Sequence, residues 1–508
     1  MKFIGKLLLY ILIALLVVIA GLYFLLQTRW GAEHISAWVS ENSDYHLAFG
    51  AMDHRFSAPS HIVLENVTFG RDGQPATLVA KSVDIALSSR QLTEPRHVDT
   101  ILLENGTLNL TDQTAPLPFK ADRLQLRDMA FNSPNSEWKL SAQRVNGGVV
   151  PWSPEAGKVL GTKAQIQFSA GSLSLNDVPA TNVLIEGSID NDRVTLTNLG
   201  ADIARGTLTG NAQRNADGSW QVENLRMADI RLQSEKSLTD FFAPLRSVPS
   251  LQIGRLEVID ARLQGPDWAV TDLDLSLRNM TFSKDDWQTQ EGKLSMNASE
   301  FIYGSLHLFD PIINAEFSPQ GVALRQFTSR NLIIDIDPDF PWQLTALDGY
   351  GANLTLVTDH KWGVWSGSAN LNAAAATFNR VDVRRPSLAL TANSSTVNIS
   401  ELSAFTEKGI LEATASVSQT PQRQTHISLN GRGVPVNILQ HWGWPELPLT
   451  GDGNIQLTAS GDIQANVPLK PTVSGQLHAV NAAKQQVTQT MNAGVVSSGE
   501  VTSTEPAQ

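Results

Sequence analysis

The stretch Ile101–Leu110 (ILLENGTLNL) decides the fold, because its alternation of apolar and polar residues recurs through most of the chain. Leu108 and Leu110 flank Asn109, and a period of two puts apolar side chains on one face of a β-strand. The same alternation predicts further strands at Ile62–Phe69, Val83–Leu87, Leu124–Phe131, Gln165–Phe168, Val194–Leu196, Leu251–Leu263, Leu273–Phe282, Leu388–Leu390 and Ile455–Thr458.

Helical patterns are short and few. In Ala32–Ser40 the apolar side chains fall on one helical face, and Ser237–Leu245 begins with a capping serine. A third short candidate is Val436–His441. We therefore predict a mainly β protein, with one N-terminal transmembrane helix followed by a long, twisted antiparallel sheet and a few short helices.

A sheet with one apolar face needs something to cover that face. A barrel, a sandwich or a β-helix covers it with protein, whereas an open sheet beside a membrane has lipid as its apolar partner. Inward leucines are most often ordinary core, so both interpretations stay open. The candidate lining residues are Val83, Ile85, Leu87, Leu108, Leu110, Leu124, Leu126, Val194, Leu196, Leu273, Leu275, Leu277, Val397, Ile399, Ile455 and Leu457.

The N-terminus carries an uncharged run from Leu7 through Leu16 to Leu26 (LLLYILIALLVVIAGLYFLL). A helix of this length spans about 30 Å, the thickness of a bilayer core. Lys2 and Lys6 precede it, which places residues 1–6 in the cytoplasm and the bulk of the chain outside. A cleaved signal peptide is the alternative, but the apolar run continues past the small-residue site that precedes a cut.

The pattern divides the chain into five parts. A cytoplasmic segment covers residues 1–6 and an anchor residues 7–27, and two β-rich halves cover 28–236 and 237–480. Residues 481–508 are rich in Gln, Thr, Ser and Val, and we expect a disordered tail there.

One motif occurs twice with identical spacing. Val194-x-Leu196-x-x-Leu199-x-Ala201 is followed by Gly206-x-Leu208, and the second copy begins at Val397 and ends at Gly409-x-Leu411. We interpret each copy as a strand, a turn in which glycine supplies positive φ, and a returning strand. A third copy begins at Val322 but breaks at Arg330-Asn331, which predicts an interruption of the sheet or a missing segment.

The composition excludes several classes of function. The 508 residues carry a net charge of −12 and no cysteine, which excludes disulfides, thiolate metal sites and a cysteine nucleophile. The acidic balance argues against nucleic acid. Phosphate-binding, serine hydrolase and zinc-protease motifs are absent from the sequence, so we expect no enzyme, no cofactor and no metal.

The acidic run Asp335-Ile336-Asp337-Pro338-Asp339 is the most tempting ligand site. It resembles the start of a calcium loop, but Phe340 stands where glycine is needed and Ala346 where the final glutamate belongs. An acidic turn after a strand is the simpler interpretation.

The block HIVLENVTFGRDGQPATLVAKSVDIALSSRQL, the later VDTILLENGTLNL and the segment Leu449–Leu457 (LTGDGNIQL), together with a single N-terminal anchor, resemble the AsmA-like proteins of Gram-negative envelopes. The resemblance covers most of the chain outside the anchor. It implies a groove-like sheet related to chorein-type bridge proteins, with an apolar interior. It also implies an inner-membrane protein whose bulk lies in the periplasm, and no catalytic residues to transfer.

Two hypotheses follow from the resemblance and the pattern together. In the first, the protein binds or conducts phospholipid along its apolar strand faces, in support of outer-membrane biogenesis and lipid homeostasis. In the second, it modulates the targeting or assembly of outer-membrane proteins through protein–protein contacts. The expected partners are membrane lipids, the inner membrane, and an outer-membrane or periplasmic protein at the C-terminal end.

Overall fold

The structure is a computed structural model. It describes residues 2–71, 74–109, 119–133, 139–155, 158–246, 248–283, 286–287, 289–319, 321–334, 342–358, 361–464 and 467–503. Two compact units make up the chain, Met1–Leu225 and Arg226–Gln508. The division therefore precedes the expected boundary at 236/237.

Two helices begin the N-terminal unit. The helix α1 (Lys2–Leu26) covers the apolar run, and Leu16 and Leu26 are both exposed on it, whereas the side chain of Leu7 lies outside the described residues. The helix α2 (Arg29–Glu41) follows after a sharp bend. Among the described residues no single helix meets the length and hydropathy of a membrane span, while Ile11–Leu26 and Arg29–Glu41 meet them together, with an 80° bend between them.

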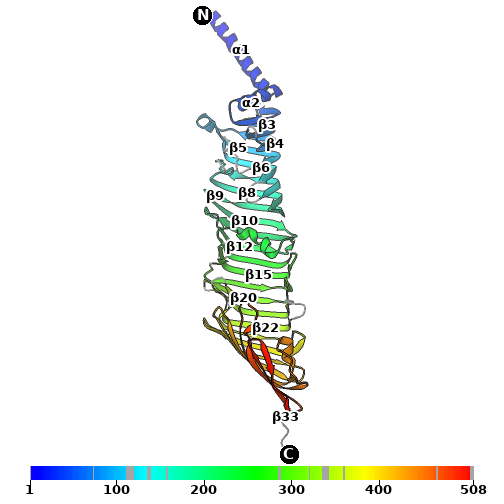
Figure 1. Cartoon of the computed structure of the whole chain (residues 1–508). Helices are drawn as coiled ribbons and strands as arrows, with labels where there is room; N and C mark the ends of the chain where they lie inside the picture. Colours follow the sequence, from blue (N-terminus) through cyan, green and yellow to red (C-terminus); the bar gives the residue numbers. More distant parts are fainter. Residues whose placement is uncertain are drawn as a thin grey trace, which may run out of the picture. The chain divides into compact units, whose positions relative to one another are not determined.

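Strands stack in chain order through the rest of the N-terminal unit (Figure 1). They are β1 (Tyr45–Ala48), β2 (Ala51–Arg55), β3 (Ala58–Arg71), β4 (Leu78–Ala86), β5 (His97–Asn109), β6 (Lys120–Ser133), β7 (Leu140–Val150), β8 (Lys163–Leu175), β9 (Val178–Asp190), β10 (Arg193–Ile203) and β11 (Gly206–Arg214). A 3-10 helix, η1 (Ser89–Leu92), precedes β5, and β12 (Trp220–Ala228) contains the division between the units. Most neighbours pair antiparallel, as the alternation predicts.

Among the strand pairs whose register the described residues give, two are parallel. The strands β5 and β6 pair in parallel from His97↔Lys120 to Asn109↔Asn132. In the C-terminal unit β13 (Arg231–Gln233) pairs in parallel with β14 (Leu251–Gln264). A parallel pair needs a crossover in place of a tight hairpin turn, and strand alternation carries no signal for it.

Several strands bend at one residue with positive φ. Asn66 in β3, Asn105 in β5 and Asp128 in β6 have φ of 54°, 52° and 52°. The registers of their neighbours place all three at the same level. Glu65 and Glu104 both pair with Ser82, Val67 and Gly106 both pair with Ala80, and Arg127 and Met129 pair with Glu104 and Gly106. Asn and Asp tolerate this left-handed conformation better than other side chains with a Cβ, and such irregularities bend a strand.

The bends change the phase of the alternation. Leu64 and Val67 border the same cavity although they are three positions apart, and so do Leu126 and Phe131, which are five positions apart. In a regular strand an odd separation would put the second side chain on the opposite face. One residue in the left-handed conformation therefore keeps the apolar face continuous on both sides of the bend.

The C-terminal unit begins with β13 and the short helices α3 (Leu238–Phe241) and α4 (Ala243–Arg246), and its strands continue to residue 503. These are β14, β15 (Trp268–Ser283), β16 (Asp286–Trp287), β17 (Gly292–Asn297), β18 (Glu300–Tyr303), β19 (Leu306–Phe309), β20 (Ile312–Ser318), β21 (Gly321–Ile334), β22 (Trp342–Thr358), β23 (Lys361–Asn372), β24 (Ala375–Phe378), β25 (Val381–Ala392), β26 (Thr396–Phe405), β27 (Ile410–Ser418), β28 (Gln424–Pro435), β29 (Asp452–Asp462), β30 (Ser474–Asn481), β31 (Gln485–Asn492), β32 (Val495–Ser498) and β33 (Thr502–Ser503). The 3-10 helices η2 (Ile438–Trp442) and η3 (Lys470–Thr472) interrupt them.

The repeated motif forms the same hairpin twice. In β10–β11 and in β26–β27 the register shifts at matching positions, between Leu196 and Leu199 and between Ile399 and Leu402. The glycine prediction is wrong in its detail, because Ala204 and Arg205 have the positive φ of the first turn. Glycine at 409 serves close packing instead, since a Cβ there would lie 2.2 Å from the carbonyl oxygen of Arg432.

The expected interruption at Arg330-Asn331 is absent from the sheet. The strand β21 runs unbroken from Gly321 to Ile334 and pairs with β22 on both sides of that point. On its other edge it pairs first with β20 and then with β19. Sheet continuity is therefore preserved there.

The expected disordered tail is also wrong for residues 485–503. Val487, Gln489 and Met491 of β31 are buried, and β31 pairs with β30 and with β32. Inward and outward side chains still alternate in this segment. The alternation is hard to recognise in the sequence because one inward position is a glutamine.

Candidate functional site: an apolar cavity in the N-terminal unit

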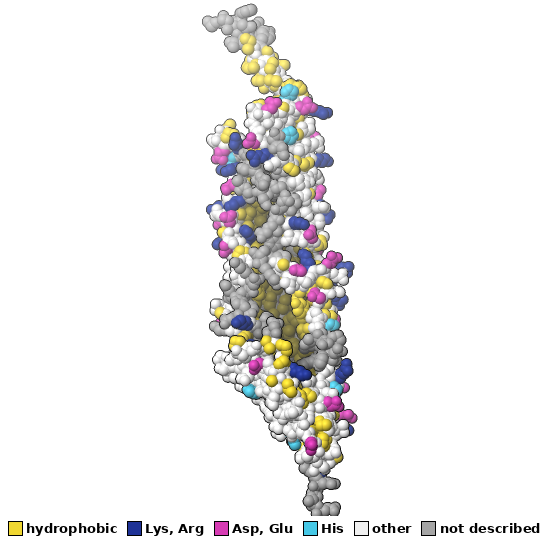
Figure 2. Space-filling model, in the orientation of Figure 1, with side chains coloured by type: hydrophobic (Ala, Val, Ile, Leu, Met, Phe, Trp, Pro, Cys, Tyr) yellow, Lys and Arg dark blue, Asp and Glu magenta, His cyan; other side chains and the backbone are white. Residues whose placement is uncertain are grey.

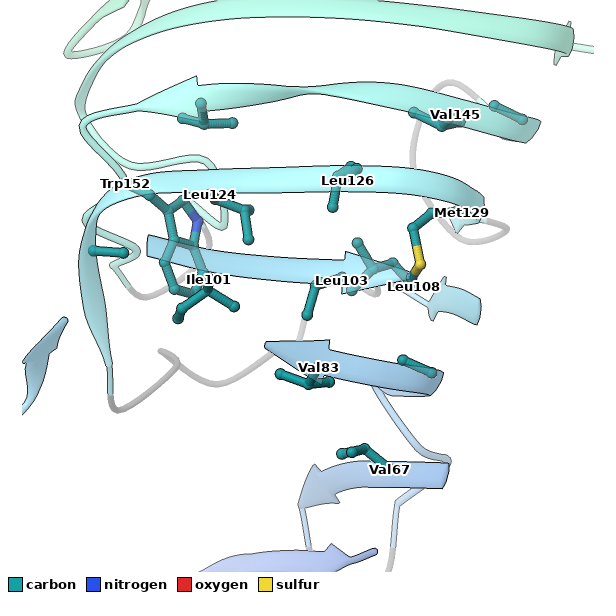
Figure 3. Close-up of a cluster of buried hydrophobic side chains, with 14 of the residues drawn as sticks. Val67, Val83, Ile101, Leu103, Leu108, Leu124, Leu126, Met129, Val145 and Trp152 are labelled. Carbon is teal, nitrogen blue, oxygen red and sulfur yellow. The ribbon is translucent and has the colours of Figure 1, made fainter. Parts of the chain in front are cut away.

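One cavity of about 1530 Å³ lies wholly within the N-terminal unit. Its lining begins at Trp38 of α2 and ends at Leu196 of β10. Aliphatic and aromatic side chains dominate the lining, and Figure 3 shows several of them projecting from successive strands, among them Val83, Leu103 and Leu126. The volume exceeds the ~300–1,000 Å³ usual for small-ligand pockets.

The structure brings seven of the candidate lining residues together at this cavity. They lie on four strands and on the residue that follows β4, and all seven border the same space: Val83, Ile85, Leu87, Leu108, Leu124, Leu126 and Leu196. Leu110 lies outside the described residues. Val194 is half-buried on β10 and is not among the described residues that line the cavity.

The other candidates belong to the C-terminal unit. On β15, Leu273 is buried and Leu275 and Leu277 are half-buried. Figure 2 shows hydrophobic side chains inside the hollows of the face in view. Val397 is half-buried on β26, while Ile399 borders a shallow hollow of about 720 Å³. Hydroxyl and amide side chains form much of that hollow, and it includes Asn398, so it is unlike the apolar cavity.

For Ile455 and Leu457 the structure corrects the expectation of an open apolar face. Both are buried in a core with residues that follow β28, including Val436, Leu439 and Trp444. In this part of the unit a segment of the chain covers the strands, so the apolar face packs against protein.

Sequence reasoning missed a set of cavity residues that includes Trp38, Phe69, Phe131, Phe168 and Leu173. Strict alternation from the first half of a strand assigns some of these positions to the wrong face. An Asn or Asp inside an apolar strand is the signal that could have located the phase change.

Charged side chains in the lining are confined to two adjoining segments. Glu94, Arg96 and His97 come from the loop after η1 and the first residue of β5, and Lys120 begins β6. The backbone N–H of Lys120 donates to the carbonyl oxygen of Arg96 at 2.9 Å, which joins the two segments. The cavity thus has an apolar interior and one charged rim.

Both acidic groups near this rim have partners. Asp122 accepts hydrogen bonds from Arg90 and from Nε2 of His97, both at 2.8 Å. Glu94 lies 3.9 Å from Nε of Arg90 and 3.4 Å from Nδ1 of His97. Arg90, His97 and the two carboxylates thus form one connected network beside the rim.

Within the described part of the chain, no group of three or more His, Cys, Asp or Glu side chains is placed to hold a metal ion. The acidic run Asp335–Asp339 lies outside the described residues. The geometry described here offers apolar burial and a charged rim.

Comparison with known proteins decides the family. The chain is 88% identical to the AsmA family protein YicH of Escherichia coli (strain K12) over 569 aligned residues, with 100% of each chain covered. The chain belongs to the AsmA family. No family model matches this AsmA-family chain. No solved structure matches it either.

The alignment also bears on length. It runs over 569 positions against 508 residues in this AsmA-family chain, so at least 61 aligned positions have no residue here. The chain is thus a shorter version of its relative, and β21 nevertheless passes unbroken through Arg330.

Proposed function

We propose that the protein is a non-enzymatic, inner-membrane-anchored periplasmic protein that binds phospholipid acyl chains in the apolar cavity of its N-terminal unit. Binding and passage of lipid along the apolar strand faces would support outer-membrane biogenesis. The cavity of about 1530 Å³ with its aliphatic and aromatic lining is the observation that carries the proposal.

Burial of apolar surface supplies the driving force. Each methylene moved from water to an apolar site contributes about 0.8 kcal/mol, so acyl chains would bind with little selectivity for chain type. Family membership supports a role associated with the cell envelope. The apolar run of helix α1, which follows Lys2 and Lys6, supports an anchor with its N-terminus in the cytoplasm.

Photo-crosslinking in cells tests the proposal. A photoreactive residue at Leu196, which borders the cavity, is compared with one at the neighbouring Thr195, which is not part of its described lining. Radiolabelled phospholipid attached at 196 and absent at 195 is the expected result. Absence of lipid at both positions in a folded, well-expressed protein would overturn the proposal.

An exposed strand edge favours the second function, modulation of outer-membrane protein assembly. In the described part of the chain β32 pairs with β31 alone, and its first residue, Val495, is 72% exposed. A free edge can accept a strand from a client protein. A photoreactive residue at Ser497 that captures a defined outer-membrane protein, in cells where position 196 captures no lipid, would put this function first.

A further inference from the structure

The rim of the apolar cavity carries two cations without partners. Neither the side chain of Arg96 nor that of Lys120 has a hydrogen-bond or ion-pair partner among the described residues, although both residues line the cavity and both are exposed. Arg90 and His97, by contrast, are engaged by Glu94 and Asp122. Glu94 and Asp122 thus bond to Arg90 and His97, and in the described part of the chain neither carboxylate bonds to the side chain of Arg96 or Lys120.

The strand pairing keeps these two cations together. His97 of β5 and Lys120 of β6 are opposite each other in the parallel ladder, and the backbone hydrogen bond between Lys120 and Arg96 extends it by one residue. Parallel pairing thus places two cationic side chains at the same end of adjacent strands. An antiparallel neighbour of β5 would have put the start of β6 at the other end of the ladder.

Apolar surface adjoins the cations directly. Phe119 precedes Lys120, is 46% exposed and borders the same cavity. Farther inside, Val98 and Ile101 of β5 and Leu124 of β6 continue the lining without charge. A ligand that fits this sequence of surfaces has an anionic group at one end and hydrocarbon at the other.

We propose that Arg96 and Lys120 form a head-group site for the phosphate of a glycerophospholipid whose acyl chains occupy the cavity. The inference rests on the proposed function, because it assigns the polar end of the same ligand. An arginine can hold two phosphate oxygens at once and a lysine adds a point charge, and such charge-assisted hydrogen bonds are stronger than neutral ones.

The test compares two lipids with identical acyl chains, dioleoylphosphatidylglycerol and dioleoylglycerol, of which only the first has a phosphate. Each is offered, radiolabelled, in neutral detergent micelles to the purified full chain with the photoreactive residue at Leu196. Attachment is measured with and without the double substitution Arg96→Gln and Lys120→Gln. The matched control is Lys163→Gln with Arg193→Gln, two exposed cations of β8 and β10 that are not part of the cavity's described lining.

The expected result is selective. The rim variant loses about tenfold in phosphatidylglycerol capture, equivalent to about 1.4 kcal/mol, and keeps its capture of dioleoylglycerol, while the control variant keeps both. An excess of glycerol phosphate, which lacks acyl chains, leaves capture unchanged if the chains provide most of the affinity.

Each contrary outcome has its own meaning. Unchanged phosphatidylglycerol capture in the rim variant overturns the head-group site and leaves the proposed function standing. Equal losses for both lipids, or an equal loss in the control variant, overturn the site too. If the protein with Arg96 and Lys120 in place captures neither lipid, the proposed function itself is overturned.

Discussion

Trp444 donates its indole N–H to Oε1 of Gln489 at 2.8 Å, and the two side chains are 8% and 2% exposed. The amide nitrogen of Gln489 donates to the carbonyl oxygen of Glu446 and to Oγ of Ser498. One glutamine on β31 thereby fastens the segment after η2 to the last strands of the chain.

Replacing Gln489 by leucine leaves the indole N–H and the Glu446 carbonyl without these partners. We expect the free energy of local unfolding to fall by about 1–3 kcal/mol, the usual cost of an unsatisfied buried polar group. Hydrogen exchange in peptides covering β30 and β31 measures it. The control is Gln476→Leu, at an exposed position of β30, and we expect it to leave the protection of these peptides against hydrogen exchange unchanged. Unchanged protection in the Gln489 variant would show that the hydrogen bonds do not hold this segment.

Gly147 and Gly200 give opposite predictions for the same change to alanine. At Gly147 φ is +140° and a Cβ would lie 2.0 Å from the carbonyl oxygen of Gln167, whereas at Gly200 no atom lies within 4 Å. We expect Gly147→Ala to cost about 1–3 kcal/mol, as overpacking does. Gly200→Ala should stay within about 0.5 kcal/mol of the unsubstituted protein. Thermal unfolding followed by circular dichroism compares them, and equal midpoints would contradict the prediction.

Asn105 tests the bend in β5. Its φ is 52°, and a β-branched residue meets steric conflict in this conformation. We expect Asn105→Val to destabilise the N-terminal unit by about 1–2 kcal/mol, while Asn105→Gly is tolerated. Limited proteolysis distinguishes the two variants through cleavage within residues 97–133. Equal resistance of both would mean that the left-handed conformation is not needed.

The pair of Glu316 and Arg325 predicts a dependence of stability on pH. The hydrogen bond from Arg325 holds the pKa of the Glu316 carboxyl below its ordinary value of 4.5. Because the pKa is lowered by folding, the stabilisation is complete above the unfolded-state pKa and disappears as pH falls through the folded-state pKa. Both side chains are about 40% exposed, so the contribution at neutral pH is below about 1 kcal/mol.

Glu316→Gln should therefore unfold slightly more easily than the unsubstituted chain at pH 7, and the difference should shrink as the pH falls through the folded-state pKa of this carboxyl. Urea unfolding measured in steps from pH 7 into the acid range follows this difference. Glu300→Gln, whose carboxylate has no ion pair in the described part of the chain, is the matched control. A difference in stability between the two proteins that grows as the pH falls would contradict the predicted direction.

Alternation predicted the strand-rich fold and grouped seven of the sixteen candidate lining residues at one cavity, because inward apolar positions are a direct consequence of strand geometry. It missed Phe131 and Phe168, because strict alternation does not allow for a bend, where a single residue shifts the following side chains to the other face of the strand. The parallel pairing of β5 with β6 depends on a crossover, which alternation does not encode. The tail was misjudged because Gln489 looks polar in the sequence, although Trp444 and Ser498 satisfy its amide.

The strands β3, β5 and β6 bend at the same level, and the position of this bend is independent of the length of the sheet. Where a strand bends is set by a single residue within it, whereas the extent of a sheet is set by how many strands follow one another, at about 4.8 Å each. Insertion or loss of whole hairpins would then lengthen or shorten the sheet without altering its cross-section.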